Sequence, residues 1–491
     1  MQDQADLALL DRPDRPRGDS PRRQPVHKLP PPLALALGLI ILVVGTMLGL
    51  VFGVAQDLFG RTAVIGVAVI LGGIMATIAA TRFWVVLVVM FVVRSSLDAL
   101  RLGSLQQLAN GALSPSVVVG VVFLASGSAW MIAQWRAGML YRMSRSTSWF
   151  LLFAFACLLS CAGSPDPFFS VQSALKVAAG ALMFAVLEQA YRQRPDRIRH
   201  LLAATFVSLI VPALVAFQQL TSNTEVEQYL QVSRIQGTFV HPNPFATYLV
   251  VVASLALAVR PHLKGINRHL ATMALVVASV LTIFTYARGA WIALLLGILV
   301  VGAKQDKRLL LGLGLMVVLV VIAVPSVTAR LSDLSETEAV GDGDANSAAW
   351  RFGYWAELLP RVAENPVTGI GMEQVLAQSP DRLQPHNSFV QAIVETGVLG
   401  FVALTGFVVS MALDLRNAIR NASPGLARGV AIGAAAAALG VSSQMVSENL
   451  LSQAAIHWYL AVPVAFALSD LTRRRDLERA RQRHERIAAM A

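Results

Sequence analysis

The chain has 491 residues, of which 55% are hydrophobic and only 14% are charged, and its mean hydropathy is +0.61. Soluble proteins carry roughly a quarter charged residues, so this composition excludes an ordinary soluble enzyme and a disordered protein. The formal net charge is +11. In a membrane protein, Lys and Arg are distributed according to topology, so this charge does not by itself indicate nucleic-acid binding.

Residues 1–32 form a polar tail with seven prolines and mixed charge. Such a segment cannot bury a core, and we expect it to be disordered. The first apolar run, residues 33–55, has 23 residues. The apolar core of a cleavable signal has only about 7–15 residues, so this run is predicted to be a spanning helix.

Further apolar runs follow along the chain. A hydrocarbon core about 30 Å thick takes roughly 17–25 helical residues. Against that length we identify fourteen candidate spans, of which the third is short: 33–55, 63–80, 83–97, 117–135, 148–163, 168–188, 201–220, 245–259, 270–287, 289–303, 309–325, 388–413, 429–446 and 451–468. The sequence therefore predicts an all-α fold, a polytopic membrane helix bundle.

The basic residues decide which side each loop faces. With the N-terminal tail inside, 30 Lys and Arg lie in inside segments, 8 in outside segments and 2 within spans. Cytoplasmic loops collect basic residues, so the reversed topology is untenable. We therefore expect a multi-pass protein of the cytoplasmic (inner) membrane with both termini cytoplasmic, including the basic tail 469–491.

Two predicted outer-face loops are long. Residues 221–244 interrupt the bundle of 33–325, and residues 326–387 precede the C-terminal transmembrane helices of 388–468. The second loop holds nine acidic residues and four arginines. Within it, Ser347–Leu359 places Trp350, Tyr354 and Leu358 on one stripe, which predicts an amphipathic helix that Pro360 ends or kinks.

Two histidines lie on the predicted outer face. His386 precedes Asn387 at the mouth of a span, where a neutral imidazole can accept a proton. His241 precedes Pro242, and its alternative interpretation is that it only shapes the loop.

Three outer-face arginines accompany them. Arg288 lies between two spans, Arg234 lies in the 221–244 loop and Arg351 lies in the loop helix. Arg288 could be an interface anchor, but a guanidinium also binds phosphate bidentately. Because outside arginines are scarce, their occurrence on one face with His386 predicts an anion site.

Charges within or beside spans are costly and often functional. They are Arg94 with Asp98, Lys176, Glu395 and Glu448. Arg94 and Asp98 could neutralise each other. Lys176 could pair with a carboxylate or with a lipid diphosphate. The two cysteines share one apolar run, and no metal-ligand motif occurs, so we predict neither a metal site nor a cofactor.

Three blocks of residues resemble the O-antigen ligase/polymerase family of membrane proteins. They span roughly 234–405: Arg288-Gly289-Ala290-Trp291; Gly237-Thr238-Phe239 with Pro242-Asn243-Pro244-Phe245-Ala246; and Arg351…Trp355, Asn365-Pro366-Val367-Thr368-Gly369-Ile370-Gly371 and His386-Asn387-Ser388-Phe389…Glu395-Thr396-Gly397-Val398-Leu399-Gly400. Twelve spans are common in that family, so the expectation is about 12–14 transmembrane helices with a large extracytoplasmic loop.

The resemblance implies a metal-independent, inverting glycosyltransferase. Its donor would be a glycan on a polyprenyl diphosphate, and its acceptor a sugar hydroxyl on another glycan or glycolipid at the outer face. Arg234, Arg288 and Arg351 would bind the diphosphate, and His386 would act as general base on the acceptor, or position it. The second shell would comprise Asn387, Glu395, His241 and Lys176.

Two questions stay open on the residues. A ligase and a polymerase share these motifs. A multi-pass transporter or channel is the alternative function, which would call for midplane sites at paired broken helices. No such paired interruption is present in the sequence, and the enzymatic interpretation is favoured.

Overall fold

A computed structural model describes residues 82–97, 115–222, 227–229, 232–312, 347–378 and 383–490. The predicted tail, the spans 33–55 and 63–80, most of the span 309–325 and Asp98 lie outside the described residues. All described residues belong to one compact unit that begins at Leu48.

The described residues form helices and one small antiparallel hairpin, β1–β2. Residues 82–94 are helical. The other elements are α4 (Pro115–Arg136), α5 (Arg145–Ser160), α6 (Pro167–Gln193), α7 (Ile198–Val207), α8 (Ile210–Ser222), β1 (Glu227–Tyr229), β2 (Val232–Arg234), α9 (Pro242–Val259), α10 (Gly265–Phe284), α11 (Arg288–Lys304), α14 (Ser347–Leu358), α15 (Gln374–Gln378), α16 (Ser388–Asn421), α17 (Leu426–Gln444) and α18 (Ala454–Met490).

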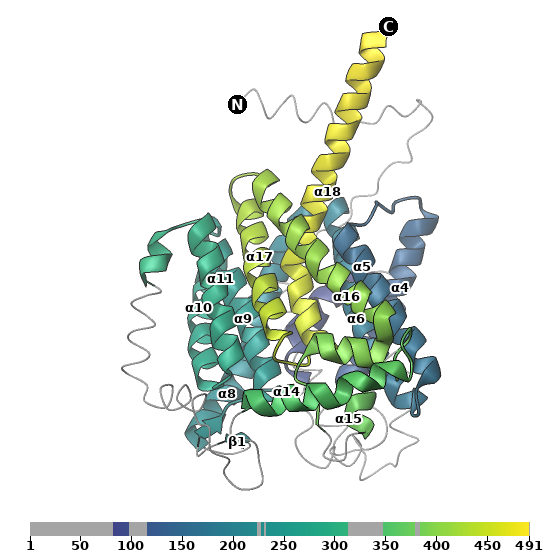
Figure 1. Ribbon diagram of the computed structural model, residues 1–491. Coiled ribbons are helices and arrows are strands. Elements are labelled where there is room, and N and C mark those ends of the chain that lie inside the picture. The colour runs from purple at the N-terminus through teal and green to yellow at the C-terminus, as the bar shows by residue number, and fades with distance from the viewer. Residues whose placement is uncertain are drawn as a thin grey trace, which may run out of the picture. The chain divides into compact units, whose positions relative to one another are not determined.

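Eight helical stretches among the described residues are long and apolar enough to cross a membrane. Each overlaps a predicted span, and the predicted all-α polytopic membrane fold is confirmed. In α9 and α18, 89% of the most apolar stretch is buried, against 28% in α10. The helices α9 and α18 therefore form the centre of the bundle, while α10 exposes an apolar surface as lipid-facing helices do (Figure 1).

Several boundaries differ from the prediction. The helix α16 continues past residue 413 to Asn421, and α18 continues past residue 468 to Met490. Hydropathy marks where the apolar stretch ends, whereas a helix can go on in water with polar residues. The exposed pair Arg481–Glu485, spaced i,i+4 at 3.0 Å, is typical of such a solvated helix.

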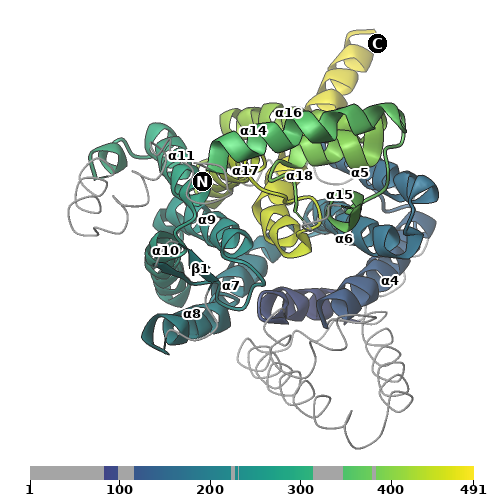
Figure 2. The same ribbon diagram turned by 60° about the horizontal axis from the view of Figure 1, so that its bottom comes forward.

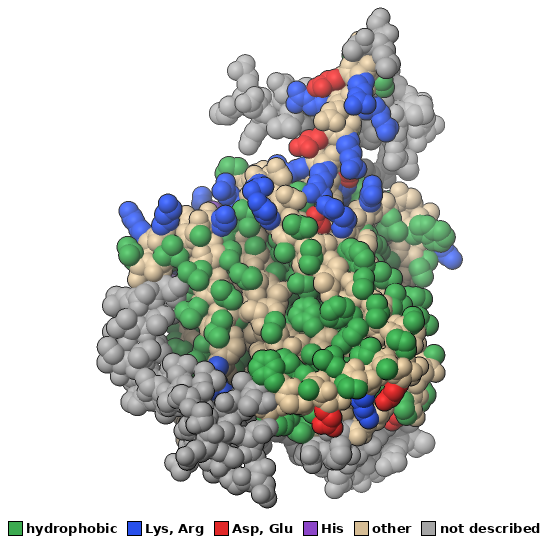
Figure 3. Space-filling model, in the orientation of Figure 1, with side chains coloured by type: hydrophobic (Ala, Val, Ile, Leu, Met, Phe, Trp, Pro, Cys, Tyr) green, Lys and Arg blue, Asp and Glu red, His purple; other side chains and the backbone are tan. Residues whose placement is uncertain are grey.

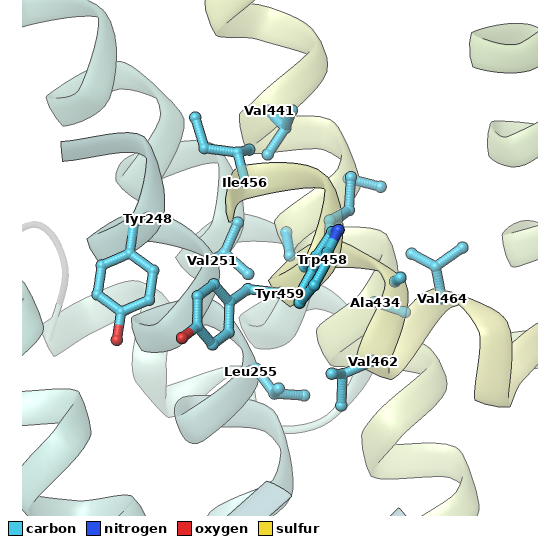
Figure 4. Packing of buried hydrophobic residues seen from close by; sticks show 14 of the residues in the cluster. Tyr248, Val251, Leu255, Ala434, Val441, Ile456, Trp458, Tyr459, Val462 and Val464 are labelled. Carbon is cyan, nitrogen blue, oxygen red and sulfur yellow. The ribbon is translucent and has the colours of Figure 1, made fainter. Parts of the chain in front are cut away.

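Aromatic side chains join the central helices. Tyr248 of α9 and Tyr459 of α18 meet edge to face, with ring centroids 4.8 Å apart (Figure 4). The Tyr459 hydroxyl donates to the Phe91 carbonyl at 2.6 Å, which ties helix 82–94 to the centre. A buried phenol needs such a partner, so this contact fixes the position of the neighbouring helix.

A break in α16 receives the preceding loop. Gly397 has φ 63° and ψ −167° inside the helix. The freed backbone groups pair with residues 366–371: Ile370 N–H donates to the Val394 carbonyl at 3.1 Å, and Val398 N–H donates to the Pro366 carbonyl at 2.9 Å. A Cβ on Gly397 would lie 2.4 Å from the Val367 carbonyl, so only glycine allows this approach.

The bundle has two chemically different ends. We call the end from which α18 extends the arginine end, because Lys and Arg gather there (Figure 3). There Arg192 of α6 pairs with Asp476 of α18 at 2.5 Å. The helix α14 lies across the opposite end (Figures 1 and 2). We call this the cavity end, because a cavity opens there.

Candidate functional site

A cavity of about 430 Å³ opens at the cavity end. It lies among helix 82–94, α4, α6, the start of α9, the loop before α16 and the link between α17 and α18. Six ionisable side chains line it, namely Arg94, Lys176, His241, Glu373, His386 and Glu448. The fold thus gathers two cations, two carboxylates and two imidazoles from distant parts of the chain.

His386 is held at the wall of this cavity. Its φ is 47°, a left-handed conformation that is costly for a residue with a Cβ. The Nδ1 atom lies 3.7 Å from Glu448 Oε2, and the imidazole meets Trp350 of α14 edge to face at 6.0 Å. Strain retained beside an ionisable partner is typical of a functional site.

The residues after His386 fix the start of α16. Asn387 caps the helix, because its side-chain oxygen accepts from Phe389 N–H at 2.9 Å and from Val390 N–H at 3.1 Å. The Ser388 hydroxyl donates to the Glu448 carbonyl at 2.7 Å. The predicted His-Asn-Ser motif therefore joins the base candidate to the α17–α18 link.

Glu448 continues a polar chain behind the cavity wall. Its Oε1 accepts from Asn243 Nδ2 at 2.7 Å, and Asn243 Oδ1 accepts from Arg234 Nη2 at 2.6 Å. Arg234 Nε donates to the Thr285 carbonyl at 3.0 Å, and Arg234 is only 6% exposed. Arg234 therefore reaches the site through Asn243 and Glu448 and does not line the cavity.

The other two predicted arginines lie nearby but outside the lining. Arg288 is half-buried and begins α11, and a Cβ on the next residue, Gly289, would lie 3.0 Å from Ser447 Oγ. Arg351 follows Trp350 in α14, and its buried Nε has no hydrogen-bond partner among the described residues. Each of these two arginines therefore lies next to a segment that contacts His386 or contains Glu448.

Of the remaining predicted residues, some line the cavity and others hold the surrounding backbone in place. Lys176 of α6 lines the cavity. His241 also lines it while capping α9, since its Nδ1 accepts from Asn243 N–H at 3.2 Å. Glu395 is buried away from the lining and accepts from the N–H groups of Glu373 at 2.8 Å and Val375 at 3.2 Å.

Three ionisable cavity residues, Arg94, Glu373 and Glu448, were not selected as site residues from the sequence, and Arg94 was considered only as a partner for Asp98. Glu373 has φ 59°, and its carboxylate accepts from Ser452 Oγ at 2.6 Å and Gln384 Nε2 at 3.1 Å. Glu448 was noted only as a charge at the edge of a span. A signal for Glu373 exists in its position two residues after Gly371, in the loop that reaches the break in α16.

The arrangement supports acid–base chemistry on an anionic ligand. An imidazole beside a carboxylate can take a proton, and Lys176 with Arg94 can neutralise developing negative charge in the same cavity. The described residues contain no group of three or more His, Cys, Asp or Glu side chains that could hold a metal ion.

Comparison with known families identifies one matching segment of the chain. A family model described as O-antigen ligase matches residues 273–405. Over this segment the chain is O-antigen ligase-like. The predicted resemblance is thereby confirmed, and the match contains Arg288, Arg351, His386, Asn387 and Glu395. No curated protein matches the chain.

The family match supports a general type of activity. O-antigen ligase-type activity, on glycan and lipid-linked substrates, is supported for a multi-pass protein of the inner membrane. It favours a glycosyltransferase-like enzyme over the transporter or channel alternative. The block at 237–246 lies outside the match, although the structure brings it to the same cavity through Phe239, His241 and Pro244.

Proposed function

We propose that the chain transfers a glycan from a polyprenyl diphosphate to an acceptor sugar hydroxyl at the outer face of the membrane. One observation carries the proposal: His386, with Glu448 at 3.7 Å, faces a cavity that Lys176 and Arg94 also line. His386 lies inside the O-antigen ligase-like segment. A base and fixed cations in one cavity are what such a transfer requires.

The proposed reaction is a single displacement. The acceptor hydroxyl gives its proton to His386, and its oxygen forms a bond to the anomeric carbon. The bond from that carbon to the diphosphate oxygen breaks, and its electron pair stays on the diphosphate. Because the base and the leaving group lie on opposite sides of the carbon, the configuration inverts. Glu448 stabilises the imidazolium that forms.

Cationic side chains would replace a metal at the leaving group. Lys176 lines the cavity itself. We assign Arg288 and Arg351 to the diphosphate because Gly289, the neighbour of Arg288, approaches Ser447 and because Arg351 follows Trp350, which meets His386. Arg234 would position Asn243 and, through it, Glu448. Guanidinium groups keep their charge at any relevant pH, so the enzyme is proposed to be metal-independent.

The arginine end supports the orientation in the membrane that we propose. Basic residues are retained on the cytoplasmic side, so we assign the arginine end and the C-terminal part of α18 to the cytoplasm. The cavity then opens to the outer leaflet. The helix α14, which lies across this end, would cover the donor and present the acceptor surface.

Replacement of the base tests the proposal. Transfer by the purified full chain is measured with a synthetic polyprenyl diphosphate-linked glycan as donor. We expect His386→Ala to lower kcat at least about 100-fold, since general base catalysis contributes that much or more. His269→Ala, an exposed histidine of the arginine end, is the matched control and should keep full activity.

The outcome that would overturn the proposal is near-full transfer by His386→Ala in protein with an unchanged Tm. A separate assay with a chelator tests the proposed metal independence. Activity that survives EDTA is expected, and activity that is lost with EDTA and restored by a divalent cation would refute metal independence.

A further inference from the structure

A second cavity lies at the arginine end. Its volume is about 270 Å³, and four guanidinium groups line it together with Ser144, Thr472 and Asp476. The four arginines come from two regions distant in the sequence. Arg142 lies just before α5 and Arg145 begins it, whereas Arg475 and Arg479 lie in α18. The proposed glycan transfer uses none of these residues.

The loop that presents Arg142 is rigidly held. Tyr141 N–H donates to Gln189 Oε1 at 2.8 Å, and Gln189 Nε2 donates back to the Tyr141 carbonyl at 3.0 Å. Ser144 N–H donates to the buried Glu188 at 2.7 Å. Ordering of this loop therefore costs no further entropy when a ligand binds.

A buried carboxylate orients two of the four arginines. Asp414 of α16 is 2% exposed, and its Oδ1 lies 3.9 Å from Arg145 Nη2 and 3.8 Å from Arg475 Nη1. Its Oδ2 accepts from the Ser146 hydroxyl at 2.9 Å. These distances exceed a hydrogen bond, so the guanidinium N–H groups keep donors for an additional anion.

The charge of the cavity remains positive after its internal pairing. The one carboxylate in its lining, Asp476, is already paired with Arg192 at 2.5 Å. Arg142 and Arg479 have no ion pair among the described residues. Arginine binds phosphate oxygens bidentately, so this donor set fits a phosphate group better than a carboxylate of a single charge.

The position of the cavity indicates where such a phosphate would come from. The apolar part of α5 begins at Trp149, four residues after Arg145, and the apolar part of α18 ends at Leu468, seven residues before Arg475. Further along α5, Leu152 and Phe155 are 38% and 58% exposed, as expected for side chains that face acyl chains. The arginines therefore lie at the level of lipid headgroups.

We propose that this cavity binds the phosphate of an anionic phospholipid headgroup, held by Arg142, Arg145, Arg475 and Arg479. The bound phosphate joins the start of α5 to α18 at the arginine end. The shared chemistry is a phosphate dianion or diester, and a soluble phosphate is the competing source that the test must separate from a lipid.

The test uses the purified full chain in a neutral detergent, with phosphatidylglycerol, phosphatidylcholine and inorganic phosphate as separate probes. Retained lipid is counted by native mass spectrometry over a titration. We expect saturable binding of one phosphatidylglycerol, much weaker binding of phosphatidylcholine, and no displacement by inorganic phosphate at millimolar concentration. Equal affinity for the two lipids, or full displacement by inorganic phosphate, would overturn the lipid assignment.

Paired variants make the test specific to the cavity. Because each basic residue near an anionic headgroup contributes about 1 kcal/mol, Arg142→Gln with Arg479→Gln should weaken phosphatidylglycerol binding about 25-fold. The control, Arg481→Gln with Arg486→Gln, removes the same charge from exposed positions of α18 and should change the affinity less than about twofold.

Both variants are at exposed arginines, so folding should persist, and an unchanged Tm without lipid checks it. Equal loss of affinity in the two double variants would show that lipid binding depends only on the net charge of the protein, and it would overturn the proposal. Transfer of glycan is not part of this readout, so failure here leaves the proposed enzymatic function untouched.

Discussion

The two ends of the bundle use the same backbone conformation for different purposes. At the arginine end, Gly138 and Gly425 have φ of 66° and 99°, and a Cβ on either would meet nothing within 4 Å. At the cavity end, Gly369 and Gly397 have φ of 71° and 63°, and a Cβ on either would lie less than 3.0 Å from backbone atoms. The first pair only turns the chain, whereas the second lets two backbones touch.

This difference explains why the cavity end can hold irregular backbone. The loop 366–371 fills the break in α16, and Glu395 satisfies the next N–H groups of the loop, at Glu373 and Val375. These buried backbone N–H groups thus find partners, as irregular backbone within membrane depth requires. Strain at His386 and Glu373 is retained because the surroundings determine their position.

The largest expected effect comes from adding a side chain where the backbones of Gly397 and Val367 touch. Gly397→Ala should destabilise the protein by about 4 kcal/mol or more, because the backbone at Val367 would have to move and the left-handed φ would remain. Gly138→Ala has the same sign of φ in open space and should cost only about 1–2 kcal/mol. Tm measured in detergent separates the two, and equal losses would contradict the contrast.

A second comparison concerns buried carboxylates. Glu188 near the arginine end accepts from Ser144 N–H and from the hydroxyls of Ser144 and Thr147, at 2.7, 2.9 and 2.7 Å. Glu395 at the cavity end accepts from two N–H groups and from Gln391 Nε2 at 3.0 Å. Both carboxylates therefore anchor a loop, but only the loop anchored by Glu395 reaches the cavity.

Isosteric replacement separates stability from activity at these two positions. Glu188→Gln and Glu395→Gln should each lower stability by about 1–3 kcal/mol, since a buried acceptor becomes a donor. Only Glu395→Gln should also lower kcat, by about tenfold or more, because Glu373 and Gln384 shift with the loop. Tm and kcat are measured on both variants. A matching loss of kcat in Glu188→Gln at assay temperature would argue that activity follows global stability instead.

Much of the framework could be predicted from local sequence. The spacing of Trp350, Tyr354 and Leu358 predicted a helix, and α14 has Trp350 stacked on Tyr354 at 5.4 Å with Leu358 buried. Helical periodicity is a local property, so it can be read without knowing the fold. Apolar runs likewise located the spans, although they could not predict how far α16 and α18 continue as solvated helices.

The site itself required the tertiary structure. Scarcity of outside arginines selected Arg234 and Arg288, but nothing local indicated that Arg234 would lie behind Asn243 or that Lys176 would line the cavity. Glu448 enters only because the α17–α18 link folds back onto Ser388. Contacts between residues separated by 60 to 200 positions depend on packing, which a single sequence does not encode locally.

The smallest expected effect isolates one charge at the cavity end. In Glu448→Gln the side chain can still accept from Asn243 Nδ2, so the polar chain to Arg234 is kept while the negative charge is lost. The imidazolium formed at His386 during transfer then lacks its partner at 3.7 Å. Because this charge develops only as the proton moves, we expect kcat to fall about tenfold with KM nearly unchanged, a loss of about 1.4 kcal/mol in transition-state stabilisation.

The matched control is the same substitution at the other end of the molecule. Glu485→Gln removes a carboxylate that is 63% exposed and that, among the described residues, pairs with its helical neighbour Arg481. Exposed pairs contribute little, so kcat, KM and Tm should all stay within error. A rise in KM without a fall in kcat for Glu448→Gln would assign the carboxylate to substrate binding instead. Position at the cavity, and not charge as such, is what separates the two carboxylates.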